Sequence, residues 1–261
     1  MTAYATLRVR RERAAAVIEL HRPERMNALS LELLGELETE LDRVDTDPGV
    51  RVVVLTGSEK AFSTGVDLNE VVAATEIGDS LRFLARLRRA NTTIETLSKP
   101  VVAAIRGYCL TGGLELALAC DLRFAASDAR FGVTSAKIGS VAGMGGTQRL
   151  PRLIGASRAK DLLLTGRFLE AGEALSAGLV DRVVEPERVV HEALAWADRC
   201  AEQAPLAVWL AKYGVNVGMN VDLGSALDLE ALLTTLAFGT EDREEGVRAF
   251  LEKRRASFQG R

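Results

Sequence analysis

The sequence predicts an α/β fold with a helical C-terminal extension. Short apolar runs alternate with amphipathic helical patterns along most of the chain, and after the run GLVDRVV only helical patterns follow. Two of the apolar runs, RVVVLTG and VVAAI, are typical of strands buried on both faces, and LRFAA has the pattern of a further strand. These observations together predict an α/β core to which C-terminal helices are attached.

A hairpin and an amphipathic helix are expected at the N-terminus. Val9 and the run from Ala15 to Leu20 form two short strands around the polar turn RRER, and the irregular segment HRPERMNAL follows. Ser30 is a plausible N-cap for a helix in which apolar residues recur at three- and four-residue spacing as far as Val44. Asp47-Pro48-Gly49 then ends this helix.

The middle of the chain repeats one pattern, in which a buried strand is followed by a loop and a helix. RVVVLTG leads into the loop SEKAFSTGVD and a helix with leucines from Leu81 to Leu97, and VVAAI leads into RGYCLTGG and the helix LELALACD. LRFAA leads into a glycine-rich loop, residues 130–150, that contains no Asp or Glu. The segments share little identity, so we expect the repetition to be structural.

Helices dominate the last part of the chain. Roughly residues 186–204, 205–218, 222–238 and 242–256 have helical patterns without intervening strands. We therefore expect a boundary near residue 195, with an α/β core over 1–195 and a helical region over 196–261.

Composition narrows the classes of protein. The 261 residues, 48% of them hydrophobic, can fill a large core, and a net charge of −3 provides no large field for nucleic acid or an anionic membrane. Cys109, Cys120 and Cys200 are odd in number and form no CxxC pair, which favours a reduced, cytoplasmic setting. No apolar run reaches membrane-spanning length, and the arginine-rich N-terminus makes a poor secretory signal.

Two loops are the best candidates for a catalytic site. The sequence contains no GK[ST] loop, GxSxG elbow, HExxH motif or clustered His/Cys set, so no metal site is predicted. AFSTGVDL follows one buried strand, and GYCLTGGLELALACD follows the next and enters a helix, where unpaired N–H groups at Thr111-Gly112-Gly113 could stabilise an oxyanion. A sterically required tight turn is the alternative. Glu115, among leucines in the first helical turn, is either a catalytic acid or a group that compensates the helix dipole.

Seven stretches of the sequence resemble the crotonase, or enoyl-CoA hydratase/isomerase, superfamily. They are HRPERMNALS, AFSTGVDL, KPVVAAIRGYCLTGGLELALACDLRFAASDARFG, GMGGTQRLPRLIG, LTG, EALSAGLVDRVV and FGTEDREEGVRAFLEKRRASF. The resemblance implies a crotonase-like spiral of ββα units with a helical C-terminal trimerisation region, assembled as a homotrimer or a dimer of trimers. Residues 1–195 would then be the acyl-CoA-binding core and residues 196–261 the oligomerisation region.

The resemblance also implies the residues of the site. The N–H groups of Val66 and Gly112 would form the oxyanion hole for the thioester carbonyl of an acyl-CoA, and Glu115 would activate water. Coenzyme A enters as part of the substrate rather than as a cofactor. Its implied contacts are Arg25, Met26, Asp67, Leu68, Asn69 and, from a neighbouring subunit, Phe250 and Lys253. Lys253 can equally belong to a solvated helix face.

The loop of residues 130–150 departs from the family pattern. Hydratases of the family carry a second glutamate three residues after Gly132, with a proline before it, but this chain has Ser135 and Thr134 there. A serine hydroxyl is a poor acid, and losing a positioned general acid typically costs roughly 10²–10⁴ in rate. Double-bond isomerases are disfavoured as well, because their base stands at the position of Ser135, and dienoyl isomerases add an aspartate at that of Gly143.

The resulting prediction is an enoyl-CoA hydratase, a lyase of fatty-acid or related acyl-CoA metabolism. Glu115 would activate water, and a water chain through Ser135 or Ser140 would deliver the α-proton. Decarboxylation, thioester hydrolysis and non-catalytic acyl-CoA binding remain as alternatives. RNA binding is disfavoured, because arginines on one helix are usually a solvated face; those in question are Arg82, Arg86, Arg88 and Arg89.

Overall fold

The structure is a computed structural model that describes residues 4–73 and 76–261. Its strands are β1 (Leu7–Glu12), β2 (Ala15–Leu20), β3 (Val52–Thr56), β4 (Ala61–Ser63), β5 (Val101–Ile105), β6 (Tyr108–Leu110), β7 (Leu122–Ala126), β8 (Arg130–Gly132), β9 (Phe168–Glu170) and β10 (Arg182–Val184). Its α-helices are α1 (Leu31–Thr46), α2 (Leu68–Ala73), α3 (Ile77–Thr96), α4 (Gly112–Leu118), α5 (Gly146–Ile154), α6 (Ala156–Thr165), α7 (Ala171–Ser176), α8 (Val189–Ala201), α9 (Pro205–Gly218), α10 (Leu223–Phe238) and α11 (Glu241–Leu251). Short 3-10 helices cover Pro23–Arg25, Ser135–Ile138 and Pro186–Arg188.

The strands form two sheets whose members alternate along the chain. The larger sheet has the order β1-β2-β3-β5-β7-β10, antiparallel between β1 and β2 and parallel elsewhere. The smaller sheet has the order β4-β6-β8-β9, with only β9 antiparallel. Each successive pair, β3–β4, β5–β6 and β7–β8, contributes one strand to each sheet before helices follow. The predicted crotonase-like spiral of ββα units is therefore confirmed.

The central strands of the larger sheet are buried on both faces, as their unbroken apolar sequences predict. In β3, Val52 and Val54 belong to the apolar cluster beneath α8, whereas Val53 and Leu55 belong to the main core. The register places β3, β5 and β7 side by side in parallel, so their carboxyl ends share one edge. The loops that follow these strands therefore start close together, and they carry the candidate site.

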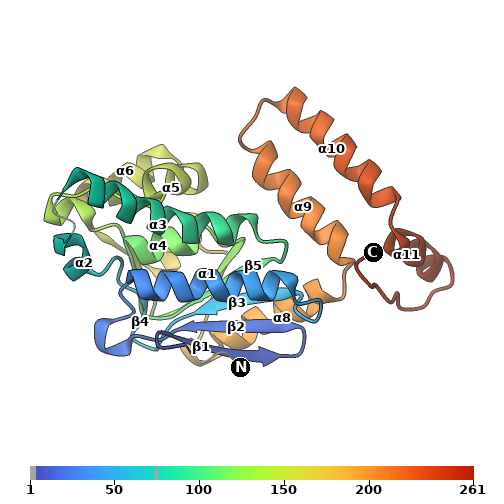
Figure 1. Ribbon diagram of the computed structural model, residues 1–261, viewed down its shortest axis with the longest axis horizontal. Coiled ribbons are helices and arrows are strands. Elements are labelled where there is room, and N and C mark those ends of the chain that lie inside the picture. Colours follow the sequence, from blue (N-terminus) through green and yellow to red (C-terminus); the bar gives the residue numbers. More distant parts are fainter. Residues whose placement is uncertain (1–3, 74–75) are drawn as a thin grey trace.

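Helix α1 begins where the sequence predicts. The Ser30 side chain accepts a hydrogen bond from the N–H of Leu33 at 3.1 Å, and the helix buries its leucines against the main core. Helix α3 packs against α1 (Figure 1). The arginines of α3 contribute to this packing, because Arg86 and Arg89 form ion pairs with Glu38 of α1 at 3.6 Å and 3.3 Å.

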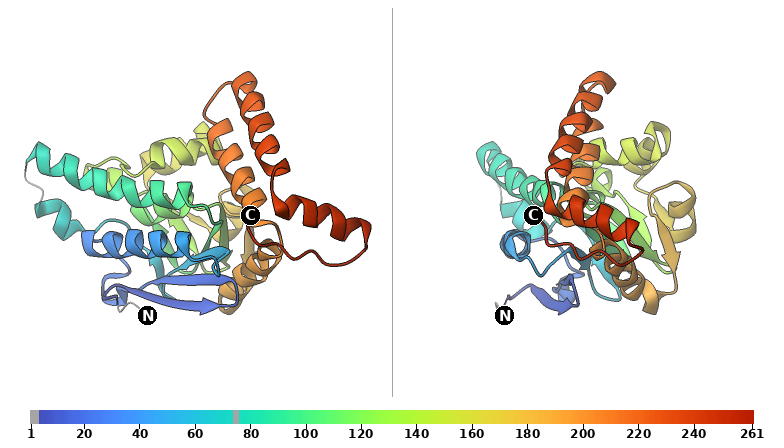
Figure 2. Two further views of the ribbon diagram at one scale, coloured as in Figure 1. Left: turned by 45° about the vertical axis from the view of Figure 1, so that its right-hand side comes forward. Right: turned by 90° about the vertical axis from the view of Figure 1, so that its right-hand side faces the viewer.

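The last three helices extend away from the core, and the two views of Figure 2 agree on this. α9 and α10 pack against each other, and α9 is attached to the core by Lys212, whose Nζ lies 3.0 Å from Asp121 Oδ2. α10 contains no buried residue. No helix within the described residues is both long and apolar enough to span a membrane.

Two features of the fold differ from the expectations or leave them open. The three-residue strands β4, β6, β8 and β9 lie in segments interpreted as loops or helices, because three residues are too few to show a period. Residue 195, the expected boundary, lies inside α8, whose Val189, Ala193 and Ala197 pack on the larger sheet. The division into 1–195 and 196–261 therefore remains a prediction.

Candidate active site

Glu115 lies in α4 with its carboxylate held by the main chain of a different segment. The whole of α4 is buried, and Glu115 is 2% exposed. Its Oε1 accepts hydrogen bonds from the N–H groups of Met144, at 2.8 Å, and of Gly146, at 2.7 Å. Within the described chain Oε2 forms no hydrogen bond. One oxygen is thus anchored, and the other is free to exchange a proton.

The surroundings of Glu115 suit a general base. Burial raises the pKa of its carboxyl above the ordinary value, and the N–H groups of Gly146 and Met144 and the charge of Arg149 oppose that rise. A carboxyl with a raised pKa accepts a proton more readily than an exposed glutamate does. The alternative role, compensation of the α4 dipole from solvent, does not fit a carboxylate with this degree of burial.

The loops of Val66 and Gly112 approach each other closely. A Cβ placed on Gly112 would lie 3.3 Å from the nitrogen of Val66 and 3.1 Å from its Cγ2, and a Cβ on Gly65 would lie 3.3 Å from the nitrogen of Gly112. Neither the Val66 nor the Gly112 N–H donates to an acceptor among the described residues. Two free donors therefore lie side by side, one of them at the N-terminus of α4.

The turn before Gly112 is strained. Thr111 has φ 47° and ψ −114°, a conformation that a β-branched residue rarely adopts. Its N–H donates to Gly132 O at 2.8 Å, and its hydroxyl lies 2.9 Å from that of Thr134. Such strain costs about 1–3 kcal/mol and persists only where its surroundings enforce it. These contacts with the end of β8 and with Thr134 fix the direction of the Gly112 N–H.

The segment that follows β8 carries hydroxyl groups where the family resemblance implies a carboxylate. Ser135 is buried, at 6% exposure, and begins the 3-10 helix that follows β8. Its hydroxyl forms no hydrogen bond with the described residues. The Thr134 N–H donates to Thr111 Oγ1 at 3.1 Å, a bond that a proline at this position would lack.

Comparison with known proteins agrees with this geometry. The family described as enoyl-CoA hydratase/isomerase matches residues 10–261. The crotonyl-CoA hydratase of Syntrophomonas wolfei is 41% identical, over 98% of both chains, and the (E)-benzylidenesuccinyl-CoA hydratase of Thauera aromatica is 42% identical over 94% of this chain and 95% of its own. The crystal structure of an enoyl-CoA hydratase from Bacillus anthracis has a TM-score of 0.94 and 41% identity, covering 98% of this chain and 100% of that one.

The chain belongs to the enoyl-CoA hydratase/isomerase family. Its two-sheet spiral with C-terminal helices is the crotonase fold, and it is an enoyl-CoA hydratase-like enzyme whose substrate class is an acyl-CoA. Among the described residues, no group of three or more His, Cys, Asp or Glu side chains is arranged to hold a metal ion.

The structure brings together the coenzyme A contacts expected near the N-terminus. The Thr64 N–H donates to Met26 O at 3.2 Å, so the segment with Arg25 and Met26 lies along the one that leads to Asp67, Leu68 and Asn69. Asp67 forms an ion pair with Arg22 at 3.0 Å. Leu68 is more than half exposed, whereas the Asp67 carboxylate accepts bonds from the N–H and side chain of Asn69.

Phe250 and Lys253 are not brought to this site within one chain. Phe250 is on α11, Lys253 lies just beyond it, and this helix is at the opposite end of the molecule from α2 (Figure 1). Phe250 is 83% exposed. Any contact of these residues with coenzyme A would have to be made to another copy of the chain.

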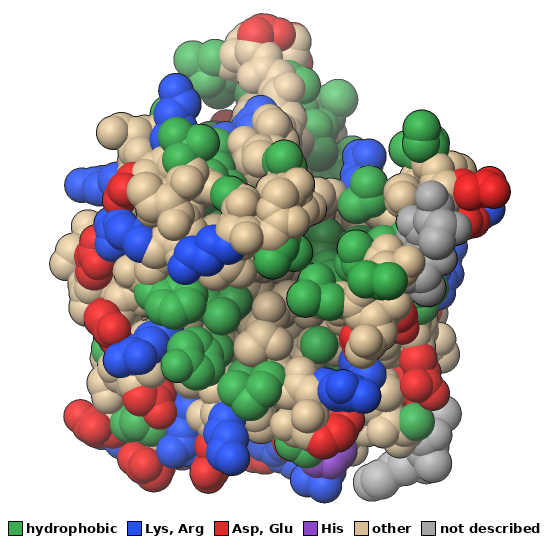
Figure 3. All heavy atoms as spheres, turned by 90° about the vertical axis from the view of Figure 1, so that its left-hand side faces the viewer, with side chains coloured by type: hydrophobic (Ala, Val, Ile, Leu, Met, Phe, Trp, Pro, Cys, Tyr) green, Lys and Arg blue, Asp and Glu red, His purple; other side chains and the backbone are tan. Residues whose placement is uncertain are grey.

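An apolar rim lies on the face of the molecule that carries α2 and the start of α3. The face that carries α2 and the start of α3 gathers hydrophobic side chains (Figure 3). Exposed apolar residues in these helices and the 130–150 loop are Leu68, Val71, Val72, Ile77, Leu81, Leu84, Ile138 and Val141. Such an exposed patch on a monomer is typical of a ligand or partner site.

Several residues of the site carry no sequence signal of their role. Met144 and Gly146 act through backbone N–H groups, which every residue but proline has. The run Gly143-Met144-Gly145-Gly146 indicates close approach of the backbone, and a Cβ on Gly146 would indeed lie 3.0 Å from Glu115 Oε1. Asn91 was missed because its partners are distant in the sequence. Thr111 was named only as part of the glycine turn, without its contacts to Gly132 and Thr134.

Proposed function

We propose that this enzyme adds water to the double bond of a 2-enoyl-CoA thioester and uses Glu115 as its single acid-base carboxylate. The observation that carries this proposal is the state of Glu115, which has one oxygen held by two N–H groups and the other oxygen free. An asymmetrically held, buried carboxylate is suited to orient one water and take its proton.

The reaction balances with the groups at hand. Glu115 takes a proton from water while the water oxygen bonds to C3, and the electrons of the double bond move to the thioester oxygen as an enolate. The N–H groups of Val66 and Gly112 stabilise that enolate, and each such donor is typically worth about 10²–10³ in rate. C2 then takes a proton from a second water at Ser135 Oγ, and this water regains a proton from Glu115.

For the α-proton relay, the burial of Ser135 favours it over Ser140, which is exposed. The Ser135 hydroxyl makes no hydrogen bond within the described chain, so it is available to a water. Ser135→Ala is expected to slow hydration without changing substrate binding, and unchanged turnover in this variant would rule out the relay.

For the substrate, we infer that coenzyme A follows the segment from Arg25 to Asn69 and that the acyl chain enters through the apolar rim. The names of two relatives with similar identity, 41% and 42%, give crotonyl-CoA and (E)-benzylidenesuccinyl-CoA as their substrates. Both aliphatic and aryl enoyl-CoA thioesters therefore belong in the first panel, which would also test the link to fatty-acid metabolism.

For assembly, we propose a homotrimer or a dimer of trimers formed through the C-terminal helices. The exposed face of α10 supports this, because Leu223, Leu227, Leu232 and Leu236 are each more than half exposed. Phe250 and Lys253 would then reach a neighbouring subunit's coenzyme A. Sedimentation equilibrium should give three or six times the chain mass, and a monomer would contradict the proposal. The three free thiols support a cytoplasmic location.

The test compares the wild type with Glu115→Gln and with Glu32→Gln, an exposed control. Loss of enoyl absorbance is measured for each thioester, and binding is measured by calorimetry. We expect wild-type hydration, a loss of about 10²–10⁴ in kcat for Glu115→Gln, and no change for the control. Equal turnover by wild type and Glu115→Gln would exclude Glu115 as the base.

A second candidate, non-catalytic acyl-CoA binding, is favoured by Ser135 in place of a carboxylate. It predicts tight thioester binding with no release of product or free coenzyme A in any variant. Decarboxylation or thioester hydrolysis would instead appear as carbon dioxide or free thiol in the same assays.

A further inference from the structure

Asn91 connects helix α4, which carries Glu115, with the segment whose N–H groups bind the Glu115 carboxylate. It lies in α3, is fully buried, and donates from Nδ2 to the main-chain carbonyls of Glu115, at 3.1 Å, and of Met144, at 2.7 Å. The first carbonyl belongs to the residue that carries the acid, and the second belongs to a residue whose N–H binds that acid. One amide therefore sets the distance between α4 and the Met144 segment.

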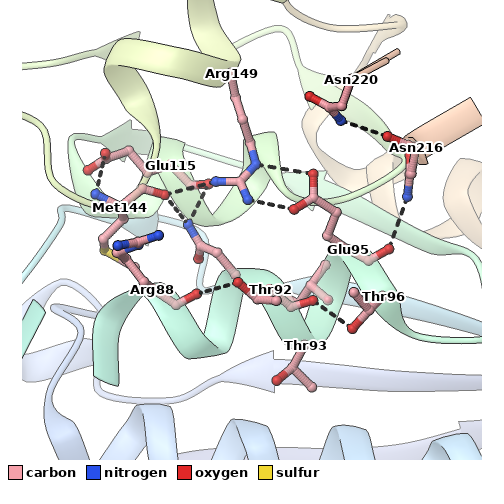
Figure 4. Close-up of polar contacts among 12 residues, drawn as sticks. Arg88, Thr92, Thr93, Glu95, Thr96, Glu115, Met144, Arg149, Asn216 and Asn220 are labelled. Carbon is pink, nitrogen blue, oxygen red and sulfur yellow. Dashed lines mark hydrogen bonds and ion pairs between the residues drawn. The ribbon is translucent and has the colours of Figure 1, made fainter. Parts of the chain in front are cut away.

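The Met144 carbonyl is also held from a second direction. Arg149 of α5 donates to it from Nη1 at 3.0 Å, and the Arg149 guanidinium forms an ion pair with Glu95 of α3 at 2.6 Å. Figure 4 shows Arg149 between Glu95 and the Met144 segment. With both donors in place, residue 144 has little freedom to rotate its N–H away from Glu115.

One atom of the Asn91 amide group is buried at a cost in free energy. Its Oδ1 is buried and forms no hydrogen bond among the described residues. An apolar side chain of similar size would avoid this unpaired atom, so packing alone does not account for asparagine here. The feature that asparagine supplies and leucine lacks is the pair of N–H donors.

We propose that Asn91 is a positioning residue for Glu115, acting by fixing the Met144 main chain that holds Oε1. This inference rests on the proposed function in one respect, namely that Glu115 is the base of the reaction. Without the hydrogen bonds from Asn91, the Met144 and Gly146 N–H groups would move away from the carboxylate. The residues that touch the substrate would stay in place.

A change in the titration of Glu115 distinguishes positioning from simple packing. The two N–H groups lower the pKa of Glu115 against the effect of burial, so weakening them raises the pKa further. Charge reaches Glu115 from Arg149, which is paired with Glu95, and strands β4 and β6, also packed on α4, carry no charged side chain. The acid-side inflection of kcat/KM should therefore move to higher pH.

The experiment compares the wild type with Asn91→Leu and with Thr93→Val, a control that removes a hydrogen bond within α3 itself. We expect Asn91→Leu to lower kcat by up to about 10²-fold with KM unchanged, the loss that a misplacement on the order of 1 Å can cause. Its acid-side inflection should rise, and amide hydrogen exchange should quicken in residues 139–147 alone. Should Asn91→Leu fail to fold, Asn91→Ser is measured in the same way.

The outcomes separate the two proposals. Wild-type hydration with unchanged kcat, inflection and exchange in the Asn91 variant would overturn the positioning role and leave the hydratase intact. A wild type inert toward every enoyl-CoA would overturn the proposed function, and hydrogen exchange over residues 139–147 would then decide the role of Asn91 without an assay of turnover.

Discussion

The two proposed walls of the site differ in the groups that they present and in how firmly those groups are held. On the α4 wall, Glu115 is buried, anchored by two N–H groups and enclosed by a helix without an exposed residue. On the segment proposed as the second wall, Ser135 and Thr134 offer hydroxyl groups, and the Ser135 hydroxyl has no partner in the described chain. Replacing a carboxylate that binds the surrounding main chain disturbs that main chain, whereas replacing a hydroxyl without a partner does not.

The walls are nevertheless connected. The hydroxyls of Thr111 and Thr134 lie 2.9 Å apart, and the Thr111 N–H donates to Gly132 O. The strained residue that directs the Gly112 N–H is therefore held by the wall that lacks a carboxylate. This segment would therefore shape the proposed oxyanion hole even though it supplies no acid.

The largest expected effect is obtained by making the two walls alike. Ser135→Glu would provide a second carboxyl opposite Glu115, and we expect a gain in crotonyl-CoA hydration of up to about 10²–10⁴. Ala136→Glu, which places the charge on the exposed neighbouring residue, should give no gain. If the wild type is already fast and Ser135→Glu adds nothing, one carboxylate suffices, and the expected penalty for its absence is wrong.

A smaller but still large effect is expected at the oxyanion hole. In Gly112→Ala, the new Cβ would lie 3.1 Å from Val66 Cγ2 and 3.2 Å from Met144 Sδ, and the two donors would be forced apart. We expect kcat to fall by about 10²–10³ with thioester binding retained. Gly172→Ala is the control, because nothing lies within 4 Å of its Cβ. Equal losses in the two variants would contradict the assignment.

The ionisation of Glu115 on α4 should affect how the free energy of unfolding depends on pH. The pKa of Glu115 is raised from 4.5 in the folded state, so the folded protein binds more protons than the unfolded chain above that value. Its contribution to the free energy of unfolding therefore falls as pH rises through the raised pKa. Relative to the wild type, Glu115→Gln should therefore gain stability as the pH rises from about 5 to about 8.

Urea unfolding of both proteins at the two pH values checks this sign. A relative loss by Glu115→Gln at the higher pH would mean that the ionised carboxylate is net stabilising. The hydration rate of the wild type should fall on the acid side with an inflection above 4.5.

The smallest effect is expected where the walls meet. Thr134→Val removes the hydroxyl beside Thr111 Oγ1 and leaves the shape unchanged, so we expect a loss of about 0.5–1.5 kcal/mol in stability and only a few-fold loss in kcat. Thr39→Val, on the exposed side of α1, serves as the control in thermal unfolding and turnover assays. A full-scale loss of activity would mean that Thr134 contacts the substrate directly.

The sequence by itself determined the parts of this protein in which side-chain chemistry is decisive. Continuous apolar runs predict strands buried on both faces, and Ser30 predicts the start of α1, because burial and capping depend on residue type. Glu115 could be named as a candidate acid from its place among leucines in the first turn of a helix. The interpretation of Ser135 as the position of a missing acid came from the family resemblance and remains a prediction.

Tertiary structure alone decided the rest. The three-residue strands β4, β6 and β8 exist only as partners of one another, and no local period marks them. The donors to Glu115 are main-chain N–H groups of Met144 and Gly146, and Asn91 reaches a carbonyl 53 positions along the chain. Every residue carries the same main-chain groups, so the sequence cannot rank them. Only the packing of α3, α4 and the loop before α5 determines which of them meet.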